Sequence, residues 1–164
     1  MENNGQTLSE KYIVSRVREF LTDKSNGGNW HDDKTRQADL HQKGVDLYFV
    51  GGKRNGERCL VECKKQDKSP GRETWLHALG QLVTRMSVSG ARGNNEFVTP
   101  SSYKYGLGLH KDIAAIALRR IPKAAAQILN LYVFSVDDDG FVKKWTPSQF
   151  GRAYPITEFS KKEN

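Results

Sequence analysis

The order of the predicted elements along the 164 residues indicates an α/β domain. A helical pattern comes first, a strand hairpin follows, several helices come next, and a second hairpin stands near the end. The length suits one domain over residues 1–164, and we expect polar, flexible ends at about 1–8 and 157–164. No apolar run approaches the length of a membrane span, and the polar N-terminus lacks the apolar stretch of a secretory signal. We therefore expect a cytoplasmic (intracellular) protein without a membrane partner.

The first element is an amphipathic helix from Glu10 to about Thr22, with Ser9 as its N-cap. The apolar stripe of this helix contains Ile13, Val14, Val17, Phe20 and Leu21. Glu10 falls within the same arc, which is unusual for a carboxylate. One interpretation is that Glu10 favours the helix N-terminus through the helix dipole. A short strand is expected around residues 29–31.

Residues 44–66 predict two strands joined by a Gly-rich turn, and this hairpin is the centre of the functional argument. The apolar strands carry Asp46, Glu62 and Lys64, although buried charge is costly unless it is paired or binds a metal. Glu62 and Lys64 point to the same face, because side chains alternate along a strand. If the two strands pair antiparallel, Asp46 and Glu62 converge at one end of the hairpin.

Two converging carboxylates suit a Mg²⁺ ion, which usually takes one or two carboxylates together with phosphate oxygens of a substrate. Lys64 would orient or deprotonate a water molecule, or stabilise charge on a phosphate. Such a set fits metal-assisted phosphodiester hydrolysis. The competing interpretation is an ordinary surface ion pair between Glu62 and Lys64.

The net charge of +7 favours a polyanionic partner, and nucleic acid is the usual one. Basic residues cluster at the hairpin tip and in the loop that follows the second strand. We expect phosphate contacts from Lys53, Arg54, Arg58, Lys65, Lys68 and Arg72. The competing interpretation for any single one of them is a solvated charge.

The second half of the chain predicts more helices and a second hairpin. A helix is expected over residues 74–88 with Gln81 between apolar neighbours, then a short strand over 96–99. Residues 101–109 are expected to be flexible, with Tyr103, Lys104 and Tyr105 either packed or stacked on nucleic acid. Helices over 110–120 and 123–129 precede a strand over 131–136. An Asp-Gly turn then leads into a strand over 141–145, followed by a helical turn at Thr146.

Cys59 and Cys63 are the two cysteines of the chain. Four residues apart on one strand, they share a face but lie roughly 13 Å apart, too far for a disulfide. We expect two reduced, buried thiols, which agrees with an intracellular protein.

Asp46, fifteen intervening residues and then Glu62-Cys63-Lys64 resemble the signature of the PD-(D/E)xK nuclease superfamily. That group includes restriction endonucleases, archaeal Holliday-junction resolvases and RecB-type nuclease domains. The chain departs from the signature at Val45, which replaces the proline. The Gly80-Gln81-Leu82 context is similar to a helix of several of these nucleases that reaches toward the site. The alternative for Gln81 is a hydrogen bond to backbone at a helix crossing.

The resemblance implies a restriction-endonuclease-like α/β fold, with a mixed central sheet flanked by helices, and a Mg²⁺-dependent DNA endonuclease. Mn²⁺ is expected to substitute for Mg²⁺. The implied metal ligands are Asp46, Glu62, the carbonyl of Cys63 and Glu10. The implied catalytic residues are Asp46, Glu62, Lys64, Glu10 and Gln81. Many members of this group act as dimers, so a homodimer is left open.

Two interpretations from other classes compete with the nuclease. One is a non-catalytic nucleic-acid-binding module that retains the nuclease fold and the basic surface. The other is a small protein-interaction domain, which requires a large exposed apolar patch that the sequence does not clearly show. Convergent carboxylates argue for the enzyme, since a binding module does not need them.

Overall fold

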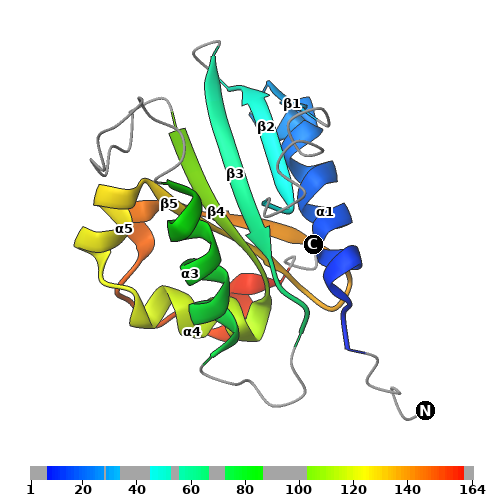
Figure 1. The fold of residues 1–164 in the computed structure, drawn as a ribbon. Coiled ribbons are helices and arrows are strands. Elements are labelled where there is room, and N and C mark those ends of the chain that lie inside the picture. The colour runs from blue at the N-terminus through cyan, green and yellow to red at the C-terminus, as the bar shows by residue number, and fades with distance from the viewer. Residues whose placement is uncertain are drawn as a thin grey trace.

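A six-stranded sheet with the strand order β1-β2-β3-β4-β5-β6 forms the centre of the molecule (Figure 1). The computed structural model describes residues 7–27, 29–33, 45–52, 56–66, 73–86 and 103–160. The strands are β1 (Trp30–Asp32), β2 (Leu47–Gly51), β3 (Glu57–Cys63), β4 (Tyr103–His110), β5 (Leu131–Val136) and β6 (Val142–Trp145). The helices are α1 (Glu10–Thr22), α3 (Thr74–Met86), α4 (Lys111–Arg120) and α5 (Lys123–Leu129), with short 3₁₀ turns η1 (Lys24–Asn26), η2 (Pro147–Gln149) and η3 (Ile156–Phe159).

The sheet is mixed, as the resemblance implies. β1, β2 and β3 pair antiparallel, β3, β4 and β5 pair parallel, and β6 returns antiparallel to β5. The parallel pairs need crossover connections, and α3 connects β3 to β4 while α4 and α5 connect β4 to β5. The expected α/β class, with a mixed sheet and helices around it, is therefore confirmed.

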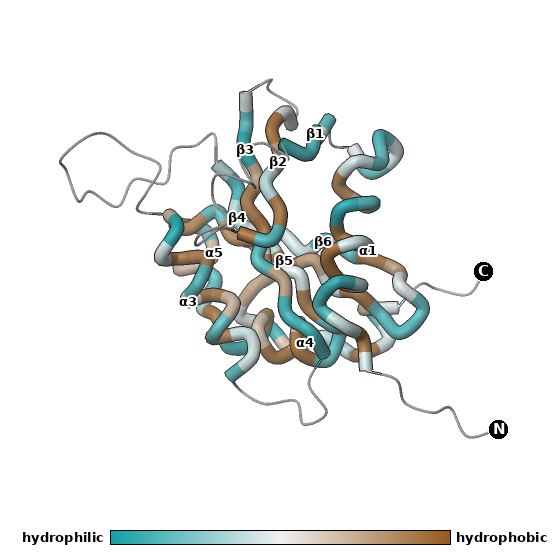
Figure 2. Tube along the Cα trace, turned by 45° about the vertical axis from the view of Figure 1, so that its right-hand side comes forward, coloured by the Kyte–Doolittle hydropathy of each residue, from teal (hydrophilic) through white to brown (hydrophobic). Residues whose placement is uncertain are grey.

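Helices cover both faces of the sheet, and each face has its own apolar core. Ile13 and Val17 of α1 pack with Leu47 and Val61 on one face. α3, α4 and α5 lie together on the other face in Figure 1, where Leu60 is one of the core residues beneath them. Figure 2 shows hydrophobic residues along the central strands, in agreement with these two cores. Because both faces are covered, β3 and β4 are buried along most of their length.

The expectation that residues 101–109 are flexible is wrong for residues 103–109, which belong to β4 in the middle of the sheet, and residues 101–102 lie outside the described part. Its glycines fit the space: a Cβ at Gly106 would lie 2.6 Å from the Phe134 ring, and one at Gly108 would lie 2.5 Å from Cys63 Sγ. Tyr103 and Tyr105 are 7 % and 0 % exposed, so they pack in the core and are not available for stacking on nucleic acid.

The remaining expected elements have mixed outcomes. Ser9 caps α1 by accepting from the backbone N of Tyr12, and the helices and strands expected over 110–145 are present as α4, α5, β5 and β6. The short strand expected near residue 30 is β1. The strand expected over 96–99 and the C-terminal end of the helix expected over 74–88 lie outside the described residues. No helix in the described ranges combines the length and apolarity needed to cross a membrane.

The C-terminal tail is held to the domain at residues where we expect a loose end. Phe159 in η3 is fully buried, and its ring centroid lies 4.5 Å from that of Trp145. The expectation of a flexible end from residue 157 is therefore wrong for residues 157–160, and residues 161–164 lie outside the described part.

Candidate functional site

Antiparallel pairing of β2 and β3 brings Asp46 next to Glu62. Leu47 pairs with Val61, so Asp46 precedes β2 at the level where Glu62 stands in β3. Asp46 Oδ2 accepts a hydrogen bond of 2.7 Å from the backbone N of Cys63. This bond joins the segment before β2 to the end of β3 and holds one carboxylate beside the other.

Glu62 is a buried acid with two cationic partners. Its side chain is 3 % exposed, Lys64 Nζ lies 3.2 Å from Oε1, and Arg85 Nη1 lies 3.1 Å from Oε2. The alternation of β3 places Glu62 and Lys64 on one face, as predicted. The interpretation as an ordinary surface ion pair is wrong, because Glu62 is enclosed between strand and helix.

The protonation equilibrium of Glu62 reflects opposing influences. Burial is the largest influence and raises the pKa of Glu62 above its ordinary value, and the nearby charge of Asp46 raises it further. Arg85 and Lys64 act in the opposite direction and favour the ionised form. The protein therefore holds two mutually repelling carboxylates together and compensates one of them with two cations.

Arg85 is the site residue that sequence reasoning missed. It stands near the C-terminal end of α3, four residues after Gln81, and packing of α3 on β3 brings it to Glu62. Gln81 itself is exposed, one turn earlier on the helix. The sequence signal for Arg85 is its place one helical turn after Gln81 on α3. Only the docking of α3 on β3 shows that Arg85, and not Gln81, reaches the Glu62 carboxylate.

The start of α1 is tied to the segment that follows the site strand. Gln66 N donates to the carbonyl of Leu8 at 3.0 Å, and Leu8 N donates to Gln66 Oε1 at 2.8 Å. Glu10 therefore lies near the end of β3. Burial is the main reason that the pKa of the Cys63 thiol is raised, and the charge of Glu10 makes a smaller contribution. Its position in the first turn of α1 also agrees with the helix-dipole interpretation.

The structure describes two of the predicted phosphate-binding residues, and these two lie far apart, one on the site strand and one after it. Lys65 is exposed directly after Lys64. Arg58 stands four residues before Glu62 on β3, roughly 13 Å along the strand, and its Nη1 donates to the Tyr103 hydroxyl at 3.2 Å. Lys53, Arg54, Lys68 and Arg72 lie outside the described residues.

A second cluster of charges follows β4 and β5, and it is structural. His110 is 1 % exposed, with Nε2 3.0 Å from Asp138 Oδ1 and Nδ1 accepting from the backbone N of Asp112. Lys111 also pairs with Asp138, and this contact is the main reason that the pKa of Asp138 is lowered. Both nitrogens of His110 are engaged, so this histidine joins α4 to the β5–β6 turn and is not placed to contact a substrate.

The donor set at the hairpin fits a hard divalent cation better than a soft one. Within the described ranges no group of three or more His, Cys, Asp or Glu side chains is arranged to hold a metal. Asp46 and Glu62 offer carboxylate oxygens, and Mg²⁺ commonly binds through one or two carboxylates with waters and substrate oxygens. Lys64 and Arg85 engage both oxygens of Glu62, so a metal ion would compete with them for this carboxylate.

Comparison of the chain with protein families, with curated proteins and with solved structures found no significant match in any of the three.

Proposed function

We propose that this chain is a Mg²⁺-dependent nuclease that hydrolyses phosphodiester bonds within DNA. The observation that supports this most is the group formed by Asp46, Glu62 and Lys64. Two carboxylates stand together at the end of a buried hairpin, and an ammonium lies 3.2 Å from one of them. The mixed six-stranded sheet with helices on both faces agrees with a restriction-endonuclease-like fold, which is part of the proposal. DNA as the substrate rests on the resemblance of the motif.

Asp46 and Glu62 would hold the metal, with the carbonyl of Cys63 as a further ligand and Glu10 as an auxiliary one. When bound, a divalent ion lowers the pKa of a coordinated water and offsets negative charge on a phosphate, and Mn²⁺ is expected to substitute for Mg²⁺. Lys64 would orient or deprotonate the attacking water and stabilise the charge that develops on the phosphate. Arg85 is a positioning residue: its ion pair with Glu62 favours the ionised carboxylate despite burial.

Energetics favour this reading over a binding module without catalysis. A buried carboxylate beside a second carboxylate destabilises a fold unless cations compensate it. A surface that only binds phosphates needs exposed cations, and a buried carboxylate such as Glu62, whose side chain is 3 % exposed, does not contribute to such binding. The binding module is supported by the net charge of +7, which both functions share.

The test is cleavage of a panel of labelled DNAs: supercoiled plasmid, linear duplex, single strand, flap and four-way junction. Each is incubated with Mg²⁺, Mn²⁺ or EDTA. The variants Asp46→Asn, Glu62→Gln and Lys64→Met are expected to lose cleavage by at least about 100-fold, because the first two remove a metal-binding carboxylate and the third removes the ammonium that stabilises the developing charge. Glu158→Gln and Lys123→Met are matched controls at exposed positions far along the chain, and they should cleave like the wild type.

Salt-sensitive DNA binding should survive in all three site variants, since they leave the remaining basic surface intact. Binding without metal-dependent cleavage by the wild type would favour the non-catalytic module. Cleavage that persists in the site variants would show that the activity has another source.

A further inference from the structure

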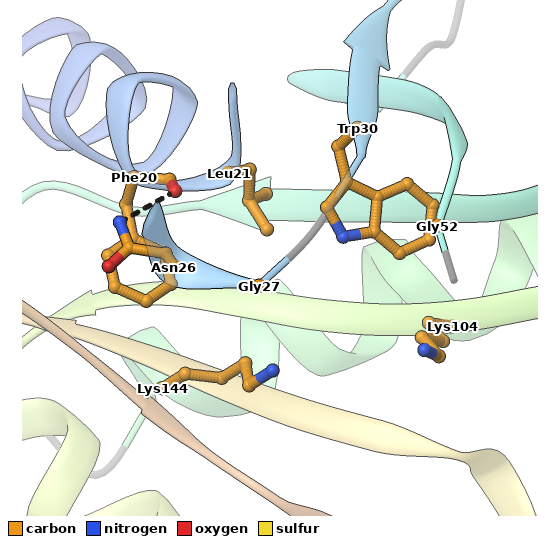
Figure 3. Close-up of a pocket in the computed structure, with 8 residues that line it drawn as sticks. All are labelled: Phe20, Leu21, Asn26, Gly27, Trp30, Gly52, Lys104 and Lys144. Carbon is orange, nitrogen blue, oxygen red and sulfur yellow. Dashed lines mark hydrogen bonds between the residues drawn. The ribbon is translucent and has the colours of Figure 1, made fainter. Parts of the chain in front are cut away.

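A small pocket lies beyond the C-terminal end of α1, on the α1 side of the sheet (Figure 3). Phe20 and Leu21 of α1 and Trp30 of β1 form its apolar walls, and Lys104 of β4 and Lys144 of β6 supply its charge. The 13-residue length of α1 makes it about 20 Å long, so the pocket is well separated from Glu10 and the carboxylates.

The two lysines reach the pocket because of strand alternation. Tyr103 and Tyr105 pack on the α3 side of the sheet, so Lys104 between them faces the α1 side. Lys144 faces that side for the same reason, since Trp145 belongs to the opposite core. Figure 3 shows both lysines on the sheet side of the pocket, Lys104 toward Trp30 and Gly52 and Lys144 toward Asn26.

The two ammonium groups lie in one region, because both are near the Tyr132 ring and both act on the Cys59 thiol. Tyr132 of β5 lies between the strands that carry the lysines, and its ring centroid is 6.0 Å from Lys104 Nζ and 5.9 Å from Lys144 Nζ. Lys104 Nζ is also 5.5 Å from the Trp30 ring centroid. Burial raises the pKa of Cys59 to about 12, and both lysine charges oppose that increase. The two cations therefore act on the same part of the molecule.

Charge and size together select the ligand. Glu57 Oε2 lies 3.5 Å from Lys104 Nζ and offsets part of the positive charge of the two lysines. The pocket has a volume of about 50 Å³. This small space lined by two lysines suits a compact anionic group such as a phosphate.

We propose that this pocket binds a single phosphate group between Lys104 and Lys144. The phosphate group can be part of a nucleic-acid strand, and this source rests on the proposed nuclease function. It can also be inorganic phosphate or part of a free nucleotide, and this source does not depend on that function. If the phosphate is part of a nucleic-acid strand, the pocket is a second contact point for that strand, at a distance from the cleavage site.

The test follows the indole N–H resonance of Trp30 by ¹H–¹⁵N NMR, assigned with a Trp30→Phe variant. Inorganic phosphate, a nucleoside 5′-monophosphate and a short single-stranded DNA are titrated in EDTA at constant ionic strength, with chloride as the reference anion. We expect a saturable shift with phosphate ligands and none with chloride. Lys144→Gln at an exposed position, and then Lys104→Gln with Lys144→Gln, should weaken binding at least about tenfold.

Lys143→Gln is the matched control, because Lys143 is the neighbouring residue on β6 and its Nζ lies over the Trp145 ring at 4.2 Å. It should leave the titration unchanged. A much lower dissociation constant for the DNA than for the two small ligands identifies a strand phosphate, and equal constants identify a free ligand. The proposal is overturned if no probe gives a saturable shift, or if Lys143→Gln weakens binding as much as Lys144→Gln. Because EDTA prevents metal-dependent cleavage, this result is independent of whether the chain is a nuclease.

Discussion

Replacing Arg85 by methionine tests whether the buried acid at the site depends on this cation. Removing one partner of a buried ion pair typically costs about 3–5 kcal/mol, because it leaves an uncompensated charge. Glu62 keeps Lys64 at 3.2 Å, and the Arg85 side chain is 19 % exposed. We therefore expect a smaller loss, about 1–3 kcal/mol in the free energy of unfolding near neutral pH.

The loss should depend on pH in a direction that the structure determines. The folded-state pKa of Glu62 is raised above its ordinary value of 4.5, so the folded state binds this proton more tightly than the unfolded chain. Stability from Glu62 is then present at low pH and decreases as the pH rises through the raised pKa. Arg85 lowers that pKa, so its removal raises the pKa further. The cost of Arg85→Met should be small near pH 4.5 and largest above the further raised pKa that Glu62 has in the variant.

Urea unfolding followed by tryptophan fluorescence measures this cost at about pH 5 and pH 8. Glu62→Gln cannot ionise, so in that background Arg85→Met should cost less, with a coupling energy of about 1–2 kcal/mol. Arg119→Met removes an exposed arginine of α4 and should change stability by no more than about 0.5 kcal/mol. An equal cost at both pH values, or an unchanged cost in the Glu62→Gln background, would refute the reasoning.

Three further predictions test packing and thiol chemistry. Gly108→Ala should destabilise the fold by about 1–3 kcal/mol in urea unfolding, because the added Cβ would lie 2.5 Å from Cys63 Sγ. The added Cβ of Gly80→Ala meets no atom within 4 Å, so this control should stabilise α3 by up to about 1 kcal/mol. Equal effects of the two substitutions on stability would contradict the packing. Cys59 and Cys63 are buried with raised pKa values, that of Cys59 to about 12, so a thiol reagent near pH 8 should label them only after unfolding, and rapid labelling of the native protein would contradict their burial. Phe159→Ala should cost about 3–5 kcal/mol because the side chain is fully buried, and a cost below about 1 kcal/mol would show that η3 does not anchor the tail.

The hairpin at the site was predictable because its signals are local. Asp46, Glu62 and Lys64 stand in apolar segments with strand periodicity, and a two-residue alternation places the last two on one face. Antiparallel pairing of neighbouring strands then requires no distant part of the chain, and the structure brings Asp46 and Glu62 together as expected.

Other features escaped prediction because they depend on segments far apart in the sequence. The glycines of β4 read as flexible, yet Gly106 and Gly108 are required where Phe134 and Cys63 approach the strand. Arg85 stands 23 residues after Glu62 in the sequence, and it reaches that carboxylate only because α3 docks on β3.

By itself, the sequence determined most of the helices and strands apart from β4, the charged hairpin, the reduced cysteines and the net positive charge. These follow from periodicity, residue type and turn chemistry, which act over a few residues. Only the tertiary structure decided that β4 lies between β3 and β5, that Glu62 is buried against two cations, and that Lys104 and Lys144 share a pocket with Trp30. Parallel pairing and helix docking join residues separated by long connections, and local patterns carry no information about which distant partners meet.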